Sequence, residues 1–127
     1  MNASKLQFSR LLPAVFFGLA MMAGIADARA AELLMFERAG CAYCLRWNAE
    51  VAPSYVVSKE ARRAPLRRVD LARGQPRDVS LVSPVRFTPT FVLVDQGKEI
   101  GRITGYMDNA MFWGLMEKMI TVLPAGH

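Results

Sequence analysis

The segment Gly40-Cys41-Ala42-Tyr43-Cys44 contains both cysteines of this 127-residue chain and constrains its fold more than any other stretch. The apolar run Leu33–Phe36 precedes it, and apolar residues at helical spacing follow it. This order predicts a strand, a tight turn and a helix that begins at or near Cys41. Free backbone N–H groups and the helix dipole favour a thiolate there. We therefore expect Cys41 to be the nucleophile and Cys44, one turn later, to resolve the mixed disulfide.

Other uses of a C-x-x-C pair were weighed against this redox interpretation. A structural zinc site needs four ligands, and the chain offers only these cysteines and His127. Covalent haem attachment needs a histidine where Leu45 stands. A purely structural disulfide is disfavoured because so short a loop removes little unfolded-state entropy. A non-catalytic copper(I) or partner-binding thiol module remains an alternative. We favour the redox pair, for which no metal or organic cofactor is required.

The first 30 residues predict a secretory signal peptide. Lys5 and Arg10 lie near the start without any acidic residue, and an uncharged apolar stretch follows up to Ala26. Small residues spaced as A-x-A then favour cleavage after Ala28 or Ala30. An uncleaved membrane anchor is the alternative, although the apolar stretch is short for a membrane span. In either case the remaining chain is expected in the periplasm, outside the cytoplasmic membrane.

Residues 31–127 are enough for one compact domain and too few for two. Removal of the leader lowers the basic and acidic counts from 16 and 11 to 13 and 10, so the formal charge falls from +5 to +3. Much of the basic charge lies in Arg62, Arg63, Arg67, Arg68, Arg73 and Arg77. These arginines form either a solvated face or a docking surface for an acidic protein. Nucleic-acid binding is excluded because no interleaved aromatic residues or known motif accompany them.

The middle of the chain predicts a broken helix and a second strand. The helix after the cysteines should break at Pro53 and then continue over Ser54–Glu60. Trp47 and Tyr55 fall on this helical pattern and are expected in the core or at its rim. Pro65–Leu71 predicts a strand with an exposed arginine pair, whereas residues 77–84 fit either a loop or a short helical turn.

The last third predicts a hairpin and a helix. Phe87–Asp95 is rich in strand-forming residues, and a turn at Gln96–Lys98 leads to a strand over Glu99–Tyr106. Asp108 is expected to cap a final helix. Its buried face should contain Met111, Phe112, Leu115, Met116, Met119 and Ile120. At this spacing the methionines are core residues rather than metal ligands.

The C-x-x-C pair together with Thr88-Pro89-Thr90 and the glycine-containing hairpin resembles the thioredoxin superfamily over residues 31–127. The resemblance implies a compact thioredoxin-like α/β fold, with a four-stranded mixed sheet and helices on both faces. It also implies a cis Thr88–Pro89 bond beside the disulfide. Thr88, Pro89 and Tyr43 are then the expected substrate-binding residues, and the backbone of Thr88 is expected to pair with the substrate.

The chain departs from ordinary cytosolic thioredoxin at three places. It lacks the first strand and helix of that family, and Ala42-Tyr43 replaces the family's Gly-Pro dipeptide. Met35 stands where the family has a buried aspartate. Glu37, four residues before Cys41, is a candidate for proton handling in its place. A solvated carboxylate at a strand end is the alternative for Glu37.

A narrower resemblance follows from Met35-Phe36-Glu37, the Cys-x-Tyr-Cys pair and Pro65–Asp70 on an exported chain. These features are similar to the small periplasmic thioredoxins that accompany bacterial sulfur-oxidation systems. That similarity implies a reductase of a cysteine on a sulfur-carrier protein, supplied with electrons by an integral-membrane thiol transporter. We expect a monomeric thiol–disulfide oxidoreductase, and a periplasmic isomerase or oxidant is the alternative.

Overall fold

The computed structural model describes residues 30–125. The predicted signal peptide therefore lies, apart from Ala30, outside the described residues and stays a prediction, and His127 lies outside them as well. Within residues 30–125, no helix combines the length and the apolar character needed to cross a membrane.

The elements follow the order that the sequence predicts. They are β1 (Glu32–Glu37), α1 (Ala42–Glu50), α2 (Ala52–Tyr55), α3 (Lys59–Arg63), β2 (Leu66–Asp70), the 3-10 helix η1 (Leu71–Arg73), β3 (Thr90–Asp95), β4 (Lys98–Thr104) and α4 (Asn109–Ile120). The predicted break at Pro53 is confirmed, because α1 ends at Glu50 and Pro53 lies in the first turn of α2. The expected continuous helix over Ser54–Glu60 is wrong. The chain instead forms one turn, α2, and then restarts as α3 at the cap Ser58.

The four strands form one mixed sheet, as predicted. Their order is β2-β1-β3-β4, with β1 parallel to β2 and antiparallel to β3, and with β3 antiparallel to β4. The central strands β1 and β3 are buried on both sides, which explains their nearly continuous apolar sequences. The compact α/β fold is therefore confirmed.

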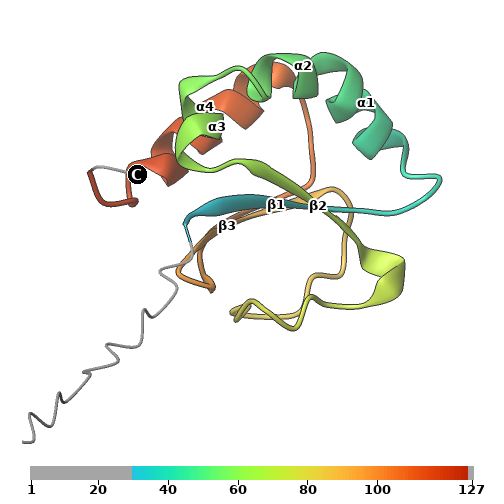
Figure 1. Ribbon diagram of the computed structural model, residues 1–127. Coiled ribbons are helices and arrows are strands. Elements are labelled where there is room, and N and C mark those ends of the chain that lie inside the picture. The colour runs from blue at the N-terminus through green and yellow to red at the C-terminus, as the bar shows by residue number, and fades with distance from the viewer. Residues whose placement is uncertain (1–29, 126–127) are drawn as a thin grey trace, which may run out of the picture.

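The two faces of the sheet are covered differently. Figure 1 shows the four α-helices on one face, and residues 71–89 pass over the other. That second face buries a smaller cluster consisting of Leu34, Phe36, Leu71, Val85, Val92 and Val94. The expectation of helices on both faces therefore holds only in part, because among the described residues the helical cover of this face is limited to the 3-10 helix η1. Gly74, Pro76 and Pro84 oppose longer helices here. Residues 77–84 form turns and bends, and Ser80 bridges to Lys98.

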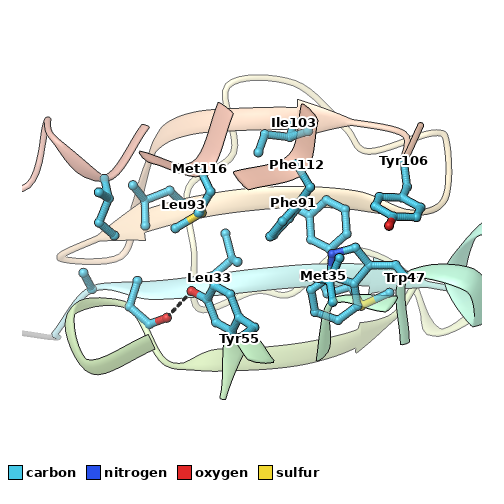
Figure 2. Close-up of a cluster of buried hydrophobic side chains, with 14 of the residues drawn as sticks. Leu33, Met35, Trp47, Tyr55, Phe91, Leu93, Ile103, Tyr106, Phe112 and Met116 are labelled. Atoms are coloured by element: carbon cyan, nitrogen blue, oxygen red, sulfur yellow. Dashed lines mark hydrogen bonds between the residues drawn. The ribbon is translucent and has the colours of Figure 1, made fainter. Parts of the chain in front are cut away.

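The larger core lies between the sheet and the helices, and aromatic rings fill its centre (Figure 2). The ring centroids of Trp47 and Phe91 lie 5.0 Å apart, and Phe112 lies 5.0 Å from Phe91 and 5.5 Å from Trp47. Tyr55 is also fully buried, and its hydroxyl donates a 2.6 Å hydrogen bond to the carbonyl of Ala64. The prediction that Trp47 and Tyr55 pack in the core is confirmed.

The predicted cap of helix α4 is confirmed, but its predicted buried face is partly wrong. The carboxylate of Asp108 accepts a hydrogen bond from the backbone N–H of Met111 at 2.8 Å. The residues that α4 buries are Phe112, Met116 and Ile120, and Met119 is half-buried. Met111 and Leu115 are instead 45% and 41% exposed. They lie toward the side of β4, the edge strand, where no other strand of residues 30–125 covers them.

The expected exposed arginine pair of the second strand is held by carboxylates. Arg67 is half-buried and donates to both oxygens of Asp78 at 2.7 and 3.0 Å, with Glu32 at 3.4 Å. Arg68 is exposed, and its guanidinium lies 2.8 Å from the carboxylate of Glu37. The basic charge of this strand is therefore largely neutralised by ion pairs.

Replacement of Phe112 by alanine should destabilise the domain by about 3–5 kcal/mol, because it removes a ring that contacts Trp47, Tyr55 and Phe91. Met111→Ala on the same helix is the control, and its cost should stay within about 0.5 kcal/mol since Met111 is exposed. Urea denaturation of the two variants measures both values. Equal losses would contradict the burial pattern of α4.

Candidate active site

The two cysteines form a disulfide at the start of α1. Gly40, at φ +77°, supplies the left-handed turn that brings the chain from β1 into the helix. Cys41 is the N-cap, and its Sγ accepts a hydrogen bond from the backbone N–H of Cys44 at 3.1 Å. The Cα atoms of the pair are 5.2 Å apart. The predicted strand, turn and helix around the cysteines are thus confirmed.

The two cysteines differ in accessibility. Cys41 is half-buried, whereas Cys44 is only 3% exposed and belongs to the larger core cluster together with Trp47. A partner sulfur can approach Cys41 more easily than Cys44. This asymmetry fits an attacking first cysteine and a resolving second one.

The predicted substrate-binding residues Tyr43, Thr88 and Pro89 line one hollow of about 420 Å³, which we call the cis-proline hollow. The Thr88–Pro89 peptide bond is cis, as the resemblance implies. Two hydrogen bonds fix this loop. The hydroxyl of Thr90 donates to the carbonyl of Phe87 at 2.7 Å, and the N–H of Gly105 donates to the carbonyl of Pro89 at 2.8 Å.

A second hollow of about 330 Å³, the cysteine hollow, is lined by Cys41, Cys44 and Glu37. Asn48 and Asp70 also line it. The structure therefore brings Glu37 to the cysteines and separates it from the cis-proline hollow, to which the C-x-x-C segment contributes Tyr43.

Arg68 holds Glu37 in place at the cysteine hollow. Its guanidinium donates to the carboxylate of Glu37 at 2.8 Å and to the side-chain oxygen of Asn48 at 2.9 Å. It also lies 3.6 Å from the sulfur of Met35, which is fully buried. The carboxylate of Glu37 is thus held by an ion pair with Arg68 rather than freely solvated. The role of Arg68 could not be predicted from the sequence, because its position beside Glu37 depends on the parallel pairing of β1 with β2. In this pairing Met35 lies opposite Arg68.

Three further residues line or support the cis-proline hollow and were not predicted. Arg46 donates to the carboxylate of Glu50 at 2.9 Å, and the hydroxyl of Tyr106 donates to the same carboxylate. The Arg46 guanidinium lies 5.6 Å from the centre of the Tyr106 ring. The Arg46 and Glu50 spacing of four residues signals an ion pair in the sequence, whereas the contact with Tyr106 spans 56 residues.

These contacts shift the pKa values of Glu50 and Tyr106. The hydrogen bond from Tyr106, together with the ion pair to Arg46, holds the pKa of the Glu50 carboxyl below its usual value. Partial burial and the neighbouring Glu50 carboxylate raise the pKa of Tyr106 to about 12. Tyr106, which lines the cis-proline hollow, therefore stays protonated at neutral pH, and the Glu50 carboxylate that it contacts stays charged.

Comparison with known proteins agrees with this geometry. The family model described as a thioredoxin-like domain matches residues 21–120. The periplasmic thioredoxin SoxS of Paracoccus pantotrophus, solved in its reduced form, is 44% identical, with a TM-score of 0.69 over 72% of this chain and 96% of that one. No curated protein matches the chain.

Two more distant structures are similar in fold alone. Thioredoxin from Malassezia sympodialis is 16% identical, with a TM-score of 0.53 over 71% of this chain and 75% of its own. Thioredoxin from Thermus thermophilus is 22% identical, with a TM-score of 0.52 over 73% and 75% of the two chains.

Replacement of Tyr106 by phenylalanine should raise the pKa of Glu50, because the hydrogen bond from Tyr106 is the main cause that lowers it. A carboxyl with a lowered pKa stabilises the fold above its unfolded pKa, and this contribution is lost as the pH falls through the folded pKa. The part of the acid-induced loss of stability that comes from Glu50 should therefore become smaller. NMR titration of the Glu50 carboxyl carbon measures the shift. Tyr43→Phe is the control, and an equal shift in both variants would contradict the assignment.

Proposed function

The chain belongs to the thioredoxin-like family, and on that premise we propose that it is an exported thiol–disulfide oxidoreductase that reduces a protein partner in the periplasm. The family and the C-x-x-C disulfide identify it as a thiol–disulfide oxidoreductase. One observation supports the proposal that the protein is a periplasmic reductase. The disulfide of this chain lies at the N-cap of α1, and the chain is 44% identical to a periplasmic thioredoxin.

The reduced protein acts through two successive exchanges. The thiolate of Cys41 attacks one sulfur of the partner disulfide, and the other partner sulfur leaves as a thiolate that takes up a proton. Cys44 then loses its proton and attacks Cys41, which releases the second partner thiol and forms the Cys41–Cys44 disulfide. Two electrons pass from the protein to its partner. The N-terminus of α1 and the N–H of Cys44 favour the thiolate of Cys41.

Glu37 accepts the proton that Cys44 loses. Cys44 is buried, and both side chains line the cysteine hollow. The 330 Å³ hollow is large enough for water to connect them. Arg68 fixes the carboxylate at 2.8 Å, so that Glu37 accepts the proton from a defined position as Cys44 attacks.

The substrate chain binds in the cis-proline hollow. Tyr43, Thr88 and Pro89 contribute its walls, and the backbone of Thr88 pairs with the residues around the partner cysteine. Pro89 is buried and fixed by the N–H of Gly105, so the loop presents a constant edge to the incoming chain. This edge holds the partner sulfur near Cys41, which lowers the entropic cost of the exchange.

The cellular assignment follows from the leader and from the similarity to the periplasmic thioredoxin SoxS. Residues 1–30 direct export and are removed. The partner is a protein that carries a cysteine in the periplasm, of which a sulfur-carrier protein is our first candidate. Because the periplasm lacks a reducing thiol pool, the protein needs a donor, and we propose a membrane thiol-electron transporter. The protein acts as a monomer.

Cys44→Ser should trap mixed disulfides between Cys41 and partner proteins, because the resolving attack is removed. Cys41→Ser should give no adducts, since the buried Cys44 cannot reach a partner. Non-reducing gels of periplasmic extracts from cells that make each variant show the adducts directly. Equal amounts of adduct from both variants would contradict the assigned order of attack.

The reduction potential of the Cys41–Cys44 pair separates a reductase from an oxidant. We expect a value near that of thioredoxin, about −270 mV, after equilibration of residues 31–127 in dithiothreitol or glutathione buffers. A value of about −120 mV, which is typical of a strong oxidant, would refute the reductase proposal. Parallel measurement with Glu37→Gln shows whether the potential depends on that carboxylate.

A further inference from the structure

An apolar surface extends away from the cis-proline hollow along α4 and β4. Its exposed large side chains are Ile100, Met107, Met111, Leu115 and Val122. Exposed apolar side chains that stand singly are ordinary, whereas a contiguous set marks a binding surface.

Three hollows make this surface continuous. The cis-proline hollow shares Gly105, Tyr106 and Met107 with a small hollow of about 90 Å³. The small hollow shares Ile103 and Leu115 with a third one of about 310 Å³, which reaches Met119 and Val122. We call the continuous depression the α4–β4 groove. One end lies beside Thr88 and Pro89, and the other lies at the C-terminal end of α4.

The fold leaves this groove open for an identifiable reason. Helix α4 packs on the sheet through a narrow stripe, Phe112, Met116 and Ile120, and β4 is the edge strand. Gly101 on β4 permits a close approach of α4, because a Cβ atom there would lie 2.5 Å from the side chain of Met119. Met111 and Leu115 remain outside this contact.

We propose that the α4–β4 groove binds an extended apolar segment of the same partner protein whose disulfide is reduced. The inference rests on the proposed reductase function. Its main support is continuity, because any chain that enters the cis-proline hollow lies at the open end of the groove. The segment next to the partner cysteine can therefore run directly onto Met107, Met111 and Leu115. Methionine side chains suit such a surface because they adapt to different partners.

The charges and the length of the groove define the occupant further. No acidic residue lines the third hollow, where Arg102 is paired with Glu99 and Lys118 has no ion pair among residues 30–125. An acidic residue at the far end of the segment would pair with Lys118. Helix α4 has 12 residues and is therefore about 18 Å long, which corresponds to about five or six residues of extended chain.

Peptides of defined sequence test the proposal. The core peptide carries one cysteine between alanines, joined as a mixed disulfide to the chromophore 5-thio-2-nitrobenzoate. Two longer peptides add a tail of about six residues that ends in glutamate. One tail has valine or leucine at alternate positions and the other has serine and glycine. Each is made with the tail on either side of the cysteine. Pre-reduced residues 31–127 attack the peptide sulfur, and release of the thiol chromophore gives the single-turnover rate constant.

The apolar tail should increase this rate constant roughly tenfold over the serine–glycine tail at low peptide concentration. Leu115→Glu and Met111→Glu should abolish the gain and leave the rate with the core peptide unchanged. Val57→Glu is the matched control, because Val57 is a 76% exposed apolar residue that lines none of the three hollows. It should keep the gain. Thermal unfolding of the three variants checks that each is folded.

A binding measurement keeps the groove separate from the reaction. Fluorescein-labelled apolar-tail peptide, with serine in place of its cysteine, should bind the oxidised protein and lose affinity in Leu115→Glu but not in Val57→Glu. If the wild type does not reduce the core peptide, the reductase function fails while this measurement still tests the groove.

Two results would overturn the proposal. One is equal rates for the apolar and the serine–glycine tails, together with binding of the apolar-tail peptide that Leu115→Glu does not weaken. The other is a wild-type dimer in sedimentation that Leu115→Glu converts to a monomer, because the groove would then hold a second copy of the chain.

Discussion

The packing of Trp47 against Phe91 and Phe112 is the contact on which the placement of the disulfide depends. Helix α1 buries only Cys44 and Trp47, so one indole anchors the active-site helix to the sheet. Its Nε1 has no hydrogen-bond partner in the described structure, at a cost of about 1–3 kcal/mol. Burial of so large a ring against three aromatic neighbours offsets that cost. The other parts of the site are arranged around a helix held in this way.

Residues 71–89, the connector over the second face of the sheet, have a different role. Its middle is attached at both sides of the sheet, since Asp78 binds Arg67 of β2 while Ser80 bridges to Lys98 of β4. The carboxylate of Glu99 and the guanidinium of Arg102 bind the backbone of Val82 and Ser83. The same contacts cover the beginning of the β4 edge, which limits pairing with other strands. The connector then ends at Thr88 and Pro89, so a segment without long helices supplies one edge of the cis-proline hollow.

Local patterns in the sequence predicted much of this molecule. The strand, turn and helix around the cysteines, the break at Pro53 and the cap Asp108 all depend on neighbouring residues, and each is confirmed. The exposure of Met111 and Leu115 could not be predicted, because helical spacing shows a broad apolar face but not which part of it the sheet covers. The clamp of Arg68 on Glu37 depends on strand register, and the contact of Tyr106 with Glu50 joins distant segments. Sequence spacing carries neither kind of information.

Neutral hydrogen bonds hold the cis-proline loop, whereas an ion pair also contributes to holding the middle of the connector. These neutral hydrogen bonds join Thr90 to Phe87 and Gly105 to Pro89, at the end that lines the cis-proline hollow. The middle is held by two backbone hydrogen bonds of Ser80 and by the partly exposed ion pair of Arg67 with Asp78, and dissolved salt screens that pair. Added salt would therefore weaken the middle of the connector more than its cis-proline end. The edge of the cis-proline hollow is therefore held by contacts that respond little to ionic strength.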